Sequence, residues 1–155
     1  MQFEIDNKKA IANRGNLFRL KQVMRRAEAG EPVKVGFIGG SITMGCLATE
    51  PELCYAYRVY EWWQEKFPKT EVSYINAGIG ATTSQFAAAR VEKDLLDQKP
   101  DVVFIDIKMP FMDGLSVIEA ARAQGIKAEF VIVSAYADFD FAKQSISLGV
   151  IEYLL

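Results

Sequence analysis

The sequence predicts an α/β fold in which five parallel strands form a sheet between two layers of helices. Short apolar runs rich in β-branched residues alternate with segments whose apolar residues recur at helical spacing. Glycine or proline separates these segments, as Gly30, Pro68 and Gly149 do. Continuous apolar strands joined by helices are typical of parallel sheets with right-handed crossovers. We therefore expect a flavodoxin-like three-layer α/β/α sandwich with strand order 2-1-3-4-5.

The expected strands are the continuous apolar runs of the chain. They cover residues 33–38, 72–76, 102–106, 130–134 and 150–154. Helical spacing is found over 17–29, 56–67, 84–95, 114–124 and 139–148. Asn16, Thr82 or Thr83, and Asp138 are residue types that cap helix N-termini.

The arrangement at the two ends of this pattern is unusual for the fold. An extra N-terminal helix precedes the first strand, and no helix follows the fifth strand. The helix over 17–29 is therefore expected to cover part of the sheet face that a last helix would cover.

Length and composition indicate one domain, residues 1–155, with half of its residues apolar. The net charge of −2, without long runs of either sign, argues against nucleic acid or an anionic membrane as a partner. No apolar run reaches the roughly 18 residues of a membrane span, and the N-terminus does not resemble a signal peptide. A cytoplasmic location, as in recombinant expression, is expected.

The chain contains no histidine and two cysteines, Cys46 and Cys54. The lack of histidine removes the usual general base near neutral pH and the commonest metal ligand. Two cysteines without histidine form neither a disulfide framework nor a zinc site, so buried or partly buried free thiols are expected. Catalysis would depend on carboxylates, lysine, cysteine or a metal held by oxygen atoms.

A glycine-rich turn follows the first expected strand, in Val35-Gly-Phe-Ile-Gly-Gly-Ser41-Ile-Thr, and a second turn is Asn76-Ala-Gly78-Ile-Gly80-Ala-Thr. On these residues the segment 1–101 resembles the SGNH (GDSL-type) hydrolases, a family of esterases and lipases. The resemblance implies that Ser41 is the nucleophile and that the N–H of Gly78 is an oxyanion-hole donor. Glycine permits the tight turn and the close approach of backbone donors that such a site needs.

The hydrolase pattern is incomplete. Where the family has a block with an asparagine oxyanion donor, this chain has Lys108-Met109-Pro110, and the final Asp-x-x-His block is absent. A serine hydroxyl without a base is a weak nucleophile. The alternative interpretation is that Ser41 satisfies hydrogen bonds in a loop or at a helix end.

A second motif follows the third expected strand, in Ile105-Asp106-Ile-Lys-Met-Pro110-Phe-Met-Asp-Gly. With Val-Ile-Val-Ser134-Ala-Tyr, it makes residues 102–155 similar to the C-terminal half of a response-regulator receiver domain, a phosphorelay module. The resemblance implies that Asp106 is the phosphoacceptor, that Ser134 hydrogen-bonds the phosphoryl group, and that Tyr153 is the switch aromatic.

The receiver pattern is also incomplete. The acidic pair that holds Mg²⁺ would follow the first strand, where this chain has Gly39-Gly40-Ser41, and the family's lysine would stand one residue beyond Leu155. Asp106 with a backbone carbonyl and waters is a poor Mg²⁺ site, so Asp106 is only a weak metal candidate and no cofactor is required. Asp113 and Asp138 are interpreted as loop and cap residues.

The two resemblances meet in the third strand, because both families have Pro-Asp and an apolar run there. The economical explanation is an engineered chimera of a segment 1–101 and a segment 102–155. We expect a designed scaffold with no complete active site and no native activity. The alternatives are a weak phosphoacceptor at Asp106 and a residual esterase at Ser41.

In the expected strand order, Ser41, Gly78, Asp106 and Ser134 converge on one rim of the sheet. Glycine-lined turns there are expected to hold an adventitious anion through backbone N–H groups, and no specific partner is implied. The fifth strand has an unprotected edge, which predicts dimerisation or swapping of elements through it.

Overall fold

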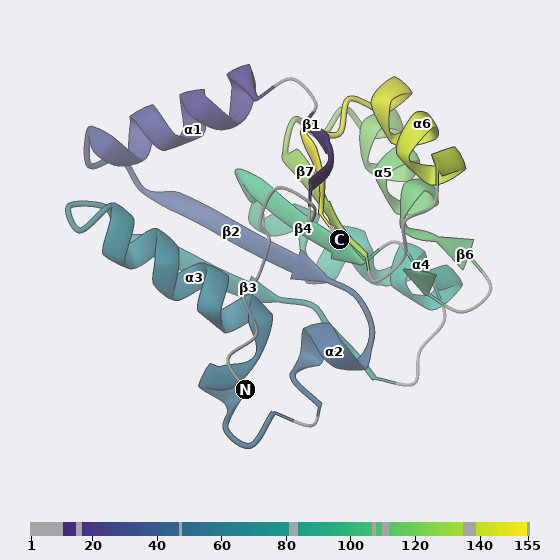
Figure 1. Cartoon of the computed structure of the whole chain (residues 1–155), viewed down its shortest axis with the longest axis horizontal. Helices are drawn as coiled ribbons and strands as arrows, with labels where there is room; N and C mark the ends of the chain where they lie inside the picture. The colour runs from purple at the N-terminus through teal and green to yellow at the C-terminus, as the bar shows by residue number, and fades with distance from the viewer. Residues whose placement is uncertain are drawn as a thin grey trace.

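The computed structural model describes residues 11–14, 17–46, 48–80, 84–106, 108–109, 112–134 and 139–154. Within them, a six-stranded sheet lies between two layers of helices (Figure 1). The strands of this sheet are β1 (Ile11–Arg14), β2 (Val33–Ile38), β3 (Val72–Asn76), β4 (Val102–Asp106), β7 (Glu129–Val133) and β8 (Glu152–Leu154). A separate antiparallel pair consists of β5 (Lys108–Met109) and β6 (Met112–Asp113).

The order in the sheet is β1-β8-β7-β4-β2-β3. β2, β3, β4, β7 and β8 run parallel and stand in the predicted order 2-1-3-4-5. The α helices are α1 (Phe18–Glu28), α2 (Ser41–Met44), α3 (Tyr55–Lys66), α4 (Ser84–Asp94), α5 (Gly114–Ala123) and α6 (Phe139–Ser147), with 3-10 turns η1 (Pro51–Leu53) and η2 (Leu96–Gln98). This is a flavodoxin-like α/β fold. Among the described helices, none has the length and apolar character needed to span a bilayer.

The outer edge of β8 is covered by β1, which pairs with it antiparallel and places Arg14 opposite Glu152. The prediction that the fifth strand has an unprotected edge for dimerisation or swapping is therefore wrong. β1 was not predicted because Ile-Ala-Asn-Arg is short and has no clear alternation of apolar and polar residues.

The sheet buries an apolar core on each face, because successive residues of a strand point to opposite sides. On β4, Val103 and Ile105 face the core beneath α4 and α5, whereas Val102 faces the core shared with α3 and α1. Both cores therefore draw on strands from the two halves of the chain.

α1 lies on the same face of the sheet as α3, and both contribute to one core. Its buried residues Val23 and Ala27 share a core with Val131 of β7 and with Ile151. The Arg19 side chain also donates to the carbonyl of Gly149 at 2.8 Å. α1 thus covers the part of the sheet near β7 and β8. Its N-cap is Leu17, without a side-chain cap bond, and Asn16, Thr82, Thr83 and Asp138 lie outside the described residues.

Two adjacent tryptophans of α3 allow a matched test of this packing. Trp63 is 2% exposed, whereas Trp62 is 47% exposed. We expect Trp63→Ala to lower the free energy of unfolding by about 3–5 kcal/mol, because it removes a buried indole and leaves a cavity. Trp62→Ala should cost about 1 kcal/mol or less. Urea unfolding followed by circular dichroism measures both values, and equal losses would contradict the arrangement of α3.

Candidate functional site

The carboxyl ends of β2, β4 and β7 meet at one rim of the sheet. Ile38 pairs with Ile105 and Asp106 pairs with Val133, so Asp106 and Ser134 end neighbouring strands. A Cβ placed on Gly39 would lie 3.0 Å from the Cβ of Asp106. The structure thus brings the turn before Ser41 next to the predicted phosphoacceptor. Tyr153 lies on β8 opposite Ile132, and its side chain is outside the described part.

Ser41 is the first residue of the short helix α2, which the sequence did not predict, and its side chain is exposed. Its carbonyl accepts hydrogen bonds from the N–H groups of Gly45 and Cys46. Among the described residues, no hydrogen-bond partner of the hydroxyl is found. The exposed Ser41 hydroxyl suits a nucleophile, but the chain has no histidine to act as its base.

The turn after β3 packs against α2 through Gly78. A Cβ on Gly78 would lie 2.5 Å from the backbone N of Met44, so glycine is required by this close approach. The N–H of Gly78 donates to Oδ1 of Asn76 at 2.9 Å, and Nδ2 of Asn76 donates to the carbonyl of Thr43 at 2.8 Å. The predicted oxyanion donor is therefore engaged within its own turn.

Gly80 lies nearer to Ser41 than its place in the motif suggested. A Cβ on Gly80 would be 3.5 Å from the Cβ of Ser41, and its N–H donates to Sδ of Met44 at 3.3 Å. Sequence reasoning quoted Gly80 and Asn76 as parts of a motif but assigned neither a role. Their contacts depend on how α2 lies against the turn after β3. The role of Gly78 as an oxyanion donor stays a prediction.

The rim also contains a polar pair that sequence reasoning missed. Thr43 is only 1% exposed, and its hydroxyl is 3.0 Å from the hydroxyl of Tyr55. Burial raises the pKa of Tyr55 to about 12, the bond to Thr43 opposes this rise, and the charge of Asp106 adds to it. The sequence gives only a weak signal for this pair, because a threonine and a tyrosine twelve residues apart do not by themselves indicate a contact.

The two thiols differ in their environment. Both are free, and Cys46 is exposed whereas Cys54 is buried. Cys54 is the N-cap of α3, where its Sγ accepts a hydrogen bond from the N–H of Tyr57 at 3.4 Å. The expectation of buried or partly buried thiols is therefore right for Cys54 and wrong for Cys46.

The donor set at the rim does not fit the Mg²⁺ ion that receiver domains bind at the phosphorylation site. A Cβ on Gly39 would lie 2.2 Å from Oγ1 of Thr43, so this position has no room for an acidic side chain. No group of three residues from Asp, Glu, His and Cys that could hold a metal is found in the described part. Mg²⁺ favours octahedral oxygen ligands that include carboxylates, and at this rim Asp106 is the candidate that the sequence supplies.

Residues 74–155, just over half of the chain, match the response regulator receiver domain family. The chain belongs to this family. The receiver match begins before the predicted boundary at 102, because β3, α4 and β4 follow the strand–helix–strand pattern common to both halves.

Two curated relatives are transcriptional regulators. The transcriptional regulatory protein YesN of Bacillus subtilis is 36% identical over 61 residues, which are 39% of this receiver chain and 17% of YesN. The DNA-binding regulator NtrC of Escherichia coli K12 is 34% identical over 79 residues, 50% of this chain and 17% of NtrC. The matched part thus spans about a sixth of these relatives.

Solved structures resemble the receiver chain in two ways. A two-domain esterase active on acetylated mannans superposes with a TM-score of 0.85 and 40% identity, covering 98% of this chain and 46% of the esterase. A chain of the CheX–CheY complex from Borrelia burgdorferi superposes with a TM-score of 0.51 and 17% identity, covering 83% of this chain and 81% of that chain. The second likeness shows the fold alone.

Neighbouring glycines test the crowding at the rim. Gly39→Ala is expected to lower the free energy of unfolding by about 1–3 kcal/mol, because the added Cβ meets Thr43 and Asp106. Gly40→Ala is the control, because no atom lies within 4 Å of a Cβ placed there. Adding Thr43→Ala to Gly39→Ala should recover part of the loss in urea unfolding. Equal costs at the two glycines would contradict the contact.

The pKa of Tyr55 tests its proximity to Asp106. In Asp106→Asn, we expect the pKa of Tyr55 to fall from about 12 while staying above its ordinary value of 10, since burial remains the main cause. Tyr74 is the internal control, because burial also raises its pKa to about 12 and Asp106 is not among the causes. Ring-carbon resonances of labelled tyrosine report both values. An unchanged Tyr55 would contradict the arrangement.

The same two phenols make stability depend on alkaline pH. Their folded pKa values lie above the unfolded value of 10, so the neutral form is favoured by folding. This contribution is fully present below pH 10 and is lost as the pH rises toward 12. Urea unfolding of the unsubstituted chain across this range is expected to show the decline. A rise in stability would contradict it.

Proposed function

We propose that this chain is a folded hybrid in which an SGNH-hydrolase-like segment, 1–101, and a receiver segment, 102–155, share one sheet without a complete active site between them. The observation that carries this proposal is the filled rim between β2 and β4. Gly39 packs against Thr43 and Asp106 at the position where a receiver domain needs carboxylates. Ser41 lies nearby, but the chain contains no histidine that could act as its general base. The engineered joining of two parent proteins in the third strand is part of the proposal.

The similarities relate the chain to two kinds of protein. The receiver family match covers residues 74–155, and the esterase structure resembles nearly the whole chain at 40% identity. Both kinds of protein have parallel strands that are connected by helices, so one sheet can contain strands from each kind. The product is an α/β scaffold in which each motif keeps its place at the rim and lacks its chemical partners.

Phosphoacceptor activity is the second candidate, and it is favoured by the position of Asp106, which pairs with Val133, the residue before Ser134. Phosphoryl transfer depends on charge stabilisation by Mg²⁺ and cationic groups around the transferred phosphoryl. Because the rim does not fit the ion, any phosphorylation of Asp106 should be slow. Residual esterase activity at Ser41 is the third candidate, supported by its exposure and by the esterase likeness.

Two assays on the purified chain test the hybrid proposal. We expect no adduct by intact mass after incubation with acetyl phosphate and Mg²⁺, and no hydrolysis of p-nitrophenyl acetate that depends on Ser41. Asp106→Asn and Ser41→Ala are the matched controls. An adduct lost in Asp106→Asn would favour the phosphoacceptor, whereas turnover lost in Ser41→Ala would favour the esterase. Either result would overturn the absence of activity.

A further inference from the structure

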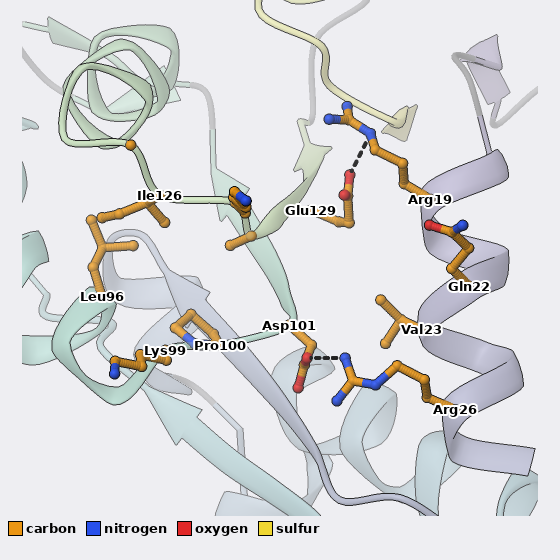
Figure 2. Close-up of a pocket in the computed structure, with 13 residues that line it drawn as sticks. Arg19, Gln22, Val23, Arg26, Leu96, Lys99, Pro100, Asp101, Ile126 and Glu129 are labelled. Carbon is orange, nitrogen blue, oxygen red and sulfur yellow. Dashed lines mark hydrogen bonds and ion pairs between the residues drawn. The ribbon is translucent and has the colours of Figure 1, made fainter. Parts of the chain in front are cut away.

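A cavity lies at the end of the sheet opposite the rim, between α1 and the segments that lead into β4 and β7 (Figure 2). Its volume is about 480 Å³, which is large enough for a small organic molecule. α1 supplies Arg19, Val23 and Arg26, and Leu96 and Ile126 form part of the opposite wall. The cavity therefore has an apolar floor and a charged border.

Two ion pairs border the cavity on the side of α1. Nη1 of Arg26 is 2.7 Å from Oδ1 of Asp101, and Nε of Arg19 is 3.3 Å from Oε2 of Glu129 (Figure 2). The first pair is a good hydrogen bond, whereas the second lacks hydrogen-bond geometry, since Oε2 of Glu129 has no hydrogen-bond partner in the described part. The Glu129 side chain is 8% exposed. A buried carboxylate oxygen without a donor is costly, and it indicates a missing hydrogen-bond donor.

A second buried atom without a hydrogen-bond partner belongs to Arg122 and has the opposite character. Arg122 lines an adjoining hollow that also includes Arg19, Ile126 and Glu129. Its Nη1 donates to the carbonyls of Ile126 and Ala128, but its buried Nη2 has no partner in the described part. Burial raises the pKa of Glu129 and lowers that of Arg122, as expected for charged groups that are incompletely solvated. A hydroxyl group can donate to the carboxylate and accept from the guanidinium.

The charge of the border selects the sign of the ligand. Lys99 and Lys127 line the cavity and are exposed, and no ion pair or hydrogen bond of either ammonium group is found among the described residues. Both acidic residues of the border already face arginines. Lys99 has a φ of +53°, the one positive value outside glycine in the described part. Such strain in a non-glycine residue is often found where a side chain is held at a functional position.

We propose that this cavity and the adjoining hollow lined by Arg122 together bind a small hydroxylated organic anion. The hydroxyl bridges Glu129 and Arg122, and the anionic group lies between Lys99 and Lys127. The apolar floor contacts the carbon skeleton. This proposal is independent of the function proposed for the rim, because it uses none of the residues at that end of the sheet.

Isothermal titration calorimetry of the whole chain at low ionic strength tests the proposal with three probes. sn-Glycerol 3-phosphate carries both required groups, inorganic phosphate carries only the anion, and glycerol carries only hydroxyls. We expect saturable binding of glycerol 3-phosphate that is about tenfold tighter than that of phosphate, and no binding of glycerol. If glycerol 3-phosphate does not bind, ordered water alone satisfies the two buried atoms. That result would overturn the proposal.

Three variants separate the parts of the site. Glu129→Gln should lower the affinity of glycerol 3-phosphate relative to that of phosphate about tenfold, because it weakens the hydroxyl acceptor, whereas the loss of negative charge beside Arg19 acts on both anions alike. Lys127→Ala is an exposed substitution expected to fold normally and to weaken both anions. Lys143→Ala on α6, also exposed, is the control and should change neither. Equal affinity for phosphate and glycerol 3-phosphate, unaffected by Glu129→Gln, would mean an adventitious ion only and would overturn the proposal.

Discussion

The pairing of β2 with β4 is the interaction on which the rest of the structure depends. It joins the segment before residue 74 to the receiver-matched segment, residues 74–155, through a parallel ladder from Val35–Val102 to Ile38–Ile105. The rings of Phe37 and Phe104 stack across it with centroids 5.1 Å apart. Parallel ladders are stable when both faces are buried, and here each face buries side chains from both segments. Each of the two cores therefore depends on both segments.

The same pairing accounts for the state of the rim. It sets the turn after β2 against the end of β4, with Thr43 beneath it and Asp106 beside it. This close packing stabilises the junction, but it occupies the volume that an acidic pair would need. The packing of this turn depends on shape alone, whereas a catalytic site depends on particular chemical partners.

The opposite end of the sheet shows how α1 is held. One face of the helix is apolar and buries Val23 and Ala27, while Arg19 and Arg26 reach acidic residues that precede or begin strands. Arg26 finds good geometry with Asp101, whereas Glu129 stays only partly satisfied. The cavity at this end of the sheet therefore combines an apolar floor with a buried acid and a border that lysines line. The packing of α1 therefore forms the cavity at this end of the sheet, away from the rim.

The sequence by itself determined the parallel strands, their order and most helix positions, because apolar periodicity and glycine or proline breaks report local structure directly. It also placed Ser41, Asp106 and Ser134 at one end of the sheet, since that follows from strand order. Only the tertiary structure decided that β1 covers β8, that Gly78 is engaged by Asn76, and that Thr43 fills the rim. These depend on contacts between residues distant in the chain or on turn geometry, which side-chain periodicity does not encode.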